Sequence, residues 1–170
     1  MALAFATATS TNILQERNIP LNLAPATTHK ALQDHNIPLG LALEIAQEAV
    51  QACAEKKYSV SAAVVDRGGI LRALLRADNA AIHTPGAARR KAYTSASARR
   101  TTSDMVRSIQ QNPDAAQLVA IDDFLVLAGG VPIQVREETI GAIGVGGAPG
   151  GDIDEACAMA ALEKVADKLK

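Results

Sequence analysis

His83 is the residue whose position in the sequence best suits chemistry. It precedes Thr84-Pro85, where Thr84 as N-cap and Pro85 as the first helical residue predict the start of a helix. The positive potential of a helix start favours a neutral imidazole, the form that ligates a metal ion or acts as a general base. The alternative is a surface or capping role. His29 and His35 are weaker candidates because they lie in the N-terminal part of the chain.

A glycine-rich run, GVGGAPGGD, leads directly into the last predicted helix. Its glycines permit close backbone approach, and the helix start exposes N–H groups without intrahelical partners. Such a loop suits a carboxylate or phosphate group. The alternative is that Asp152 and Glu155 already satisfy those N–H groups as a D-x-x-E capping box. The ligand-binding candidates in this loop are Gly146, Gly147, Gly150, Gly151 and Asp152.

Arg89 and Tyr93 are four residues apart and share one face of the helix predicted after His83. Arg89 could pair with an anionic ligand while Tyr93 donates a hydrogen bond to it. Arg90 and Lys91 point elsewhere. A solvated basic face with Tyr93 in the core is the alternative.

Three residues, Asp154, Glu155 and Cys157, lie near the start of the last predicted helix, where a carboxylate and a thiol of lowered pKa could do acid–base work. Cys53 and Cys157 both stand in Ala-rich helical patterns without CxxC spacing, which predicts buried, reduced thiols. The sequence contains no HExxH motif and no P-loop.

The composition argues against nucleic acid and membrane surfaces as partners. The chain has 17 Lys and Arg against 18 Asp and Glu, and only 2% aromatic residues. The apolar fraction of 48% is rich in Ala, which buries little area per residue and therefore favours a homo-oligomer. The start, MALAFATATSTNILQ, lacks a basic segment before its apolar stretch, so we expect a cytoplasmic protein.

Hydrophobic periodicity predicts an α+β domain in the order α-β-β-α-α-β-β-β-α. Hairpin, helices and meander do not alternate as βαβ units, so we expect an antiparallel five-stranded sheet flanked by helices, of profilin or PAS-like layout. Residues 1–38 are expected to form an arm and residues 39–170 the domain. The expected elements are helices at 39–56, 84–99, 102–112 and 152–170, a hairpin at 58–76, and strands at 123–128, 131–136 and 139–145.

Three stretches in this order resemble the GlcG/HbpS-like family, which is related to the C-terminal domain of PduO-type proteins. They are VVDRGGILRALLR, HTPGAARRKAYTSAS and GGVPIQVREETIGAIGVGGAPGGDIDEACA. The resemblance implies a profilin-like α+β domain, usually oligomeric, with some members that bind or degrade haem.

Three hypotheses of function follow. The first is a haem-binding protein with His83 or Tyr93 near the iron and cationic or backbone groups on the propionates. The second is an enzyme acting on a small carboxylate or aromatic metabolite, with His83 as base and the glycine loop as oxyanion donor. The third is a non-catalytic oligomer. A ligand pocket is expected between residues 77–93 and 144–155.

Overall fold

The computed structural model describes residues 34–170, and the secondary structure within them begins with a helix and a hairpin. The helix α1 spans Leu39–Glu55, and strands β1 and β2 span Ser61–Asp66 and Leu71–Arg76. Asp66 shapes the hairpin turn, because its Oδ1 accepts hydrogen bonds from the N–H groups of Gly68 and Ile70. The predicted arm at residues 1–38 and its His29 lie mostly outside the described residues, and its boundary stays a prediction.

Two helices and a 3₁₀ segment follow the hairpin: α2 spans Thr84–Ala98, α3 spans Thr102–Gln111, and η1 spans Pro113–Ala120. The N-cap of α2 is His83 and not Thr84. The Thr84 hydroxyl is used elsewhere, in bonds to the Ala81 carbonyl and the Ser61 hydroxyl. The cap of α3 is Thr101, whose Oγ1 accepts from the Asp104 N–H.

The chain ends with β3 at Gly130–Val135, β4 at Glu138–Gly146, α4 at Gly151–Lys164 and η2 at Ala166–Lys168. The predicted D-x-x-E capping box is wrong, because the N-cap of α4 is Gly150 and no side chain caps it. The Glu155 carboxylate instead accepts from the Ser103 hydroxyl and the Gly129 N–H. Asp152 is exposed.

The predicted antiparallel α+β fold is confirmed, but the described sheet has four strands and not five. Its order is β2-β1-β4-β3, and every neighbouring pair is antiparallel. The expected strand at 123–128 is a loop on α2. Thr94 Oγ1 accepts from the Leu125 N–H, and Arg90 donates to the Phe124 carbonyl. These side chains satisfy backbone groups that a strand neighbour would otherwise satisfy.

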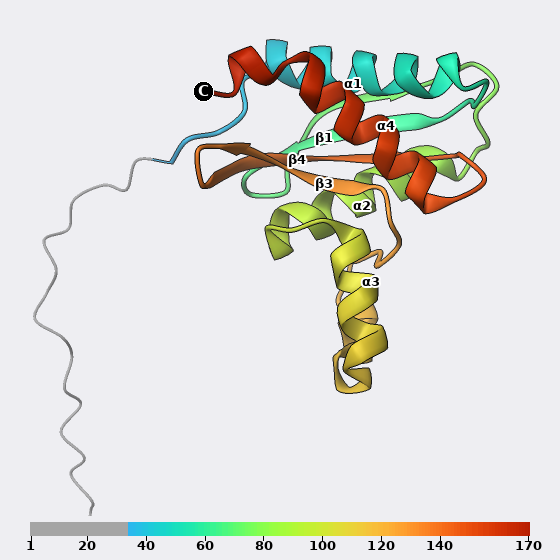
Figure 1. The fold of residues 1–170 in the computed structure, drawn as a ribbon, viewed down its shortest axis with the longest axis vertical. Helices are drawn as coiled ribbons and strands as arrows, with labels where there is room; N and C mark the ends of the chain where they lie inside the picture. Colours follow the sequence, from blue (N-terminus) through green and yellow to red (C-terminus); the bar gives the residue numbers. More distant parts are fainter. Residues whose placement is uncertain (1–33) are drawn as a thin grey trace, which may run out of the picture. The chain divides into compact units, whose positions relative to one another are not determined.

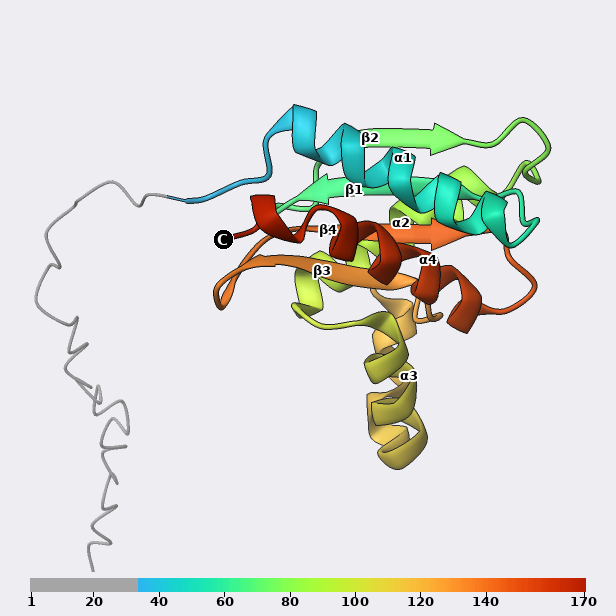
Figure 2. The ribbon, with the colours of Figure 1, turned by 45° about the horizontal axis from the view of Figure 1, so that its top comes forward.

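The sheet is covered on both faces (Figures 1 and 2). Helices α1 and α4 lie side by side on one face, and α2 covers the other. The main core lies between the sheet and the α1–α4 layer, where Ile45, Val64, Ile143 and Val145 are fully buried. Helix α3 projects away from the sheet in both views.

Cys53 of α1 and Cys157 of α4 form a disulfide with a Cα–Cα distance of 5.5 Å. The prediction of two reduced thiols is therefore wrong. Both helices present small alanines to each other, so their backbones approach closely enough for the two side chains to meet. The bond joins the two helices that cover one face of the sheet.

Candidate functional site

The structure brings His83 close to part of the glycine loop. A Cβ on Gly147 would lie 3.2 Å from Cγ2 of Thr84, the neighbour of His83. The imidazole of His83 is exposed and makes no capping hydrogen bond. A role for His83 as metal ligand or base stays a prediction.

The loop glycines have a packing role that accounts for them without a ligand. Gly147 has φ +133°, and a Cβ there would lie 2.9 Å from the Ser59 carbonyl oxygen. A Cβ on Gly151 would lie 2.7 Å from the Ala128 carbonyl oxygen. The space that these glycines clear is filled by the protein's own backbone. Binding of an anion by Gly146, Gly147, Gly150, Gly151 and Asp152 stays a prediction.

Arg89 and Tyr93 both face the loop that follows η1. Arg89 binds the Asp123 carboxylate at 2.5 and 3.2 Å, and the hydrogen bond to Asp123 raises the pKa of Arg89. Tyr93 meets Phe124 edge to face, with ring centroids 6.1 Å apart. Both side chains therefore have partners within the fold. Cys157 is no candidate nucleophile in this structure, because its sulfur is held in the disulfide.

A buried ion pair connects α2 with α4, and the sequence analysis missed it. Lys91 is 2% exposed, and its Nζ donates to Asp154 Oδ2 at 2.8 Å and to the Val145 carbonyl at 3.0 Å. Asp154 Oδ1 accepts from the Ala148 N–H at 3.0 Å. Lys91 lies next to Ala92 and three residues after Ala88 on a face of small residues, which is the sequence signal for its burial. The pair joins both helices to the loop after β4.

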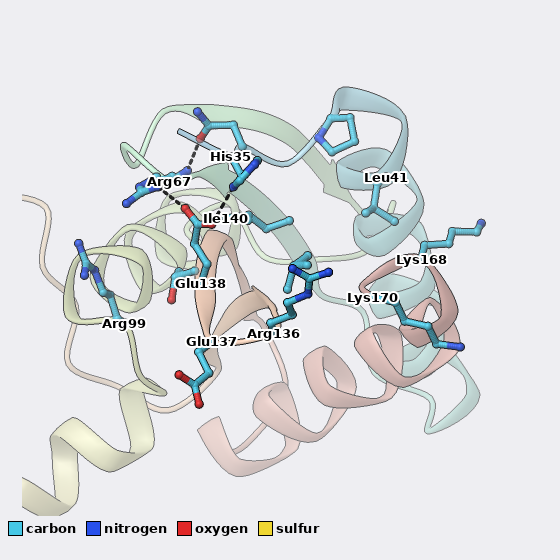
Figure 3. A pocket seen from close by; sticks show the side chains of 14 residues that line it. His35, Leu41, Arg67, Arg99, Arg136, Glu137, Glu138, Ile140, Lys168 and Lys170 are labelled. Atoms are coloured by element: carbon cyan, nitrogen blue, oxygen red, sulfur yellow. Dashed lines mark hydrogen bonds and ion pairs between the residues drawn. The ribbon is translucent and has the colours of Figure 1, made fainter. Parts of the chain in front are cut away.

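A cavity of about 740 Å³ lies at the opposite end of β4 from the glycine loop (Figure 3). The segment before α1, the β1–β2 turn, the end of α2, the β3–β4 turn and the last residues contribute its walls. Its lining includes five cationic side chains, one imidazole, two carboxylates and four apolar side chains. The cations are Arg67, Arg99, Arg136, Lys168 and Lys170, the imidazole is that of His35, and the carboxylates are those of Glu137 and Glu138. The apolar residues are Pro38, Leu41, Val135 and Ile140.

The cationic groups surround the cavity. In Figure 3, Arg67 and Arg99 lie on one side and Lys168 and Lys170 on the other, with Arg136 between them. Lys168 also binds Glu44 at 2.6 and 2.8 Å, and this hydrogen bond raises the pKa of the lysine. Two of the five cations are paired with carboxylates outside the lining, Arg67 with Asp34 and Lys168 with Glu44. Among the described residues Arg99, Arg136 and Lys170 form no ion pair, and these three cations favour an anionic ligand.

Glu138 joins His35 to Arg67 at the mouth of the cavity. Its Oε2 lies 2.8 Å from His35 Nδ1, and its Oε1 accepts from Arg67 Nη1 at 2.5 Å. The hydrogen bond from His35 is the largest cause that lowers the pKa of Glu138, and the charge of Arg67 lowers it further. His35 was a weaker candidate from the sequence because it lies in the N-terminal part of the chain, and no local pattern indicated its contact with Glu138, 103 residues away.

Residues 37–163 match the model of a family described as haem degrading protein HbpS-like. This chain belongs to the HbpS-like family. Protein GlcG of Escherichia coli strain K12 is 37% identical to this chain over 91 residues. These residues are 54% of this chain and 66% of GlcG, so the match spans just under two thirds of the length of GlcG.

Solved structures of HbpS-like proteins share the fold. HbpS of Streptomyces reticuli, crystallised as a double mutant, is 35% identical with a TM-score of 0.76, over 83% of this chain and 94% of the other. The crystal structure of a PduOC:Heme complex has a TM-score of 0.68 and 18% identity, over 75% of this chain and 94% of the other, and it supports the fold alone.

Within residues 34–170, no helix has the length and apolar character needed to span a membrane.

Proposed function

We propose that this HbpS-like protein binds a small anionic ring compound, with haem as the first candidate, in the cavity at the β3–β4 turn. The observation that carries the proposal is the combination of five cations and an apolar wall around about 740 Å³. Cofactor sites occupy about 300–1,000 Å³ and combine apolar lining with a few placed polar groups. The description of the matching family as haem degrading supports haem over other rings.

The donor set of the cavity fits haem. Propionates require cations, which Arg99, Arg136 and Lys170 supply, and a porphyrin face requires apolar contacts, which Leu41 and Val135 supply. Haem, when bound, supplies an iron with axial positions open to a protein ligand. The residues of this chain would bind the acidic edge, exclude water from the ring and orient it.

This site differs from the one expected between residues 77–93 and 144–155. The cavity uses none of His83, Arg89, Tyr93 or the glycine loop. The alternative function, an enzyme acting on a small carboxylate or aromatic metabolite with His83 as general base, has only the exposed imidazole in its support.

The proposal is tested by titrating the full chain with ferric haem and following the Soret band. Arg136→Glu should weaken binding by about ten- to a hundredfold, because it removes a charge-assisted contact and adds a like charge. Lys56→Glu is the matched control, since Lys56 is exposed at the end of α1 and lies outside the cavity. Equal binding by all three proteins would contradict the cavity as the site.

A further inference from the structure

The segment that carries His35 is attached to the start of β4 and to the β1–β2 turn. The Ile37 N–H donates to the Ile140 carbonyl at 3.0 Å, and the Ile37 side chain is fully buried. Asn36 Oδ1 accepts from the Arg67 N–H at 3.0 Å. These contacts keep His35 beside the cavity rather than at the end of a free segment.

The imidazole itself is oriented by a carboxylate. A Glu138 carboxylate can only accept hydrogen bonds, so the 2.8 Å contact requires the proton to be on His35 Nδ1. The lone pair of the neutral ring is then on Nε2. Metal-ligating histidines usually have this arrangement, in which the second ring nitrogen donates to a carboxylate that sets the tautomer and the ring orientation.

Glu138 is in turn held by Arg67. Arg67 Nη1 binds Glu138 Oε1 at 2.5 Å and Asp34 Oδ1 at 3.0 Å. The His35 side chain is 74% exposed, so the ring can be reached by a ligand that enters the cavity. Arg67, Glu138 and His35 therefore form a chain of contacts that ends at an accessible nitrogen.

His35 lies outside the family match, whereas Arg67 and Glu138 lie within it. The match covers residues 37–163, whereas His35 precedes it and Lys168 and Lys170 follow it. The cavity thus combines family residues of the β3–β4 turn with residues outside the matched range.

We propose that His35 Nε2 is the iron ligand of a metalloporphyrin bound in this cavity, and that Glu138 is the positioning residue that orients the ring. This inference rests on the proposed function, because it requires the cavity to bind a porphyrin. It adds that the site distinguishes an iron porphyrin from the metal-free ring, since only the former can bond to Nε2.

The test compares ferric haem with metal-free protoporphyrin IX, using the full chain. Haem binding is followed by the Soret band and protoporphyrin binding by its fluorescence. His35→Ala should shift the Soret band of the complex and weaken haem binding by about tenfold or more. The affinity for protoporphyrin should stay within about twofold, because the cations that hold its carboxylates remain.

Two further sets of variants separate ligation from folding. Glu138→Ala should reproduce part of the spectral change, and Glu138→Gln should partly restore the wild-type spectrum because its amide oxygen still accepts from Nδ1. Lys56→Ala, at an exposed position outside the cavity, is the control, and His83→Ala tests the competing histidine, which also lies outside the cavity. Circular dichroism of each variant confirms that the fold is intact.

The outcomes distinguish the two proposals. If wild type binds both porphyrins and His35→Ala changes neither the haem spectrum nor the haem affinity, the ligand assignment is overturned and the proposed function stands. A spectral change in His83→Ala instead of His35→Ala also overturns the assignment. If wild type binds neither porphyrin, the proposed function fails and the assignment fails with it.

Discussion

The Lys91–Asp154 pair shows how a single buried contact can set the arrangement of distant segments. Two charges removed from water are costly unless each remaining donor and acceptor finds a partner. Here Lys91 Nζ has two acceptors, and Asp154 binds both Nζ and the Ala148 N–H. The pair holds α2, α4 and the loop after β4 in one geometry.

Removing one member of this pair should be strongly destabilising. Lys91→Met leaves the Asp154 carboxylate buried without its cation, and the expected loss in the free energy of unfolding is about 3–5 kcal/mol. Urea unfolding followed by circular dichroism measures it. Lys56→Met, at an exposed position, should change the same free energy by no more than about 0.5 kcal/mol. A loss below about 1 kcal/mol for Lys91→Met would contradict the account of the pair.

The starts of α2 and α4 are recognisable in the sequence, and the segments beside them were expected to lie near each other. The structure places Thr84, the neighbour of His83, beside Gly147. The partners of His35 and Lys91 could not be predicted in the same way. Glu138 is 103 residues from His35, and Asp154 is 63 residues from Lys91. Such contacts depend on strand register and helix packing, which no local pattern specifies.

At the scale of the elements, α2 packs on β4 through backbone rather than through large side chains. A Cβ on Gly144 would overlap the Ala88 carbonyl and lie 2.5 Å from the Ala92 nitrogen. Large residues at this interface would force the helix away from the sheet.

Gly144→Ala should therefore lower the free energy of unfolding by about 1–3 kcal/mol or more. Gly86→Ala, on helix α2, is the matched control because a Cβ there meets nothing within 4 Å. It should be neutral or stabilising by up to about 1 kcal/mol. Similar destabilisation of both variants in urea unfolding would argue against the close contact.

The disulfide between α1 and α4 should stabilise the layer that covers one face of the sheet. Its two cysteines are 104 residues apart, so the bond restricts the unfolded chain strongly. Reduction should cost about 2–5 kcal/mol, measured as thermal unfolding with and without a thiol reductant. The Cys53→Ala/Cys157→Ala variant should not respond to the reductant. Titration of two free thiols in unreduced, denatured protein would contradict the bond.

The observed order differs from the predicted one, because one of the five expected strands is absent from residues 34–170 and two 3₁₀ segments are present. The remaining helices and strands were predictable because amphipathic helices and turn signals are local. The errors fall where tertiary contacts decide. Residues 123–128 have the apolar composition of a strand, but α2 side chains satisfy their backbone groups.

Reduced cysteines are typical of a cytoplasmic protein. Disulfides persist mainly in oxidising compartments, so the disulfide removes that argument, and the location stays a prediction.

For the molecule as a whole, η1 and the loop that follows it carry apolar side chains that residues 34–170 leave uncovered. Val119 of η1 is 60% exposed, and Ile121 and Leu127 of the following loop are also exposed. Exposed apolar side chains that gather in one region can mark a protein contact. We propose that these side chains contribute to the contact between copies in a homo-oligomer.

Light scattering should therefore give a mass that is a multiple of 17.7 kDa at micromolar concentration. Val119→Asp should shift the distribution toward the monomer, because it places a charge in the apolar contact. Gln110→Asp, at an exposed polar position on α3, is the control and should leave the mass unchanged. A wild-type protein that is only monomeric would contradict the proposal.

The central claim is that the cavity at the β3–β4 turn is the ligand site. A crystal structure of the full chain grown with haem tests it most directly. The account predicts a porphyrin between His35 and the Lys168–Lys170 side of the cavity, with its carboxylates on the lining cations. A porphyrin bound beside His83 and residues 146–151, with the cavity empty, would contradict it.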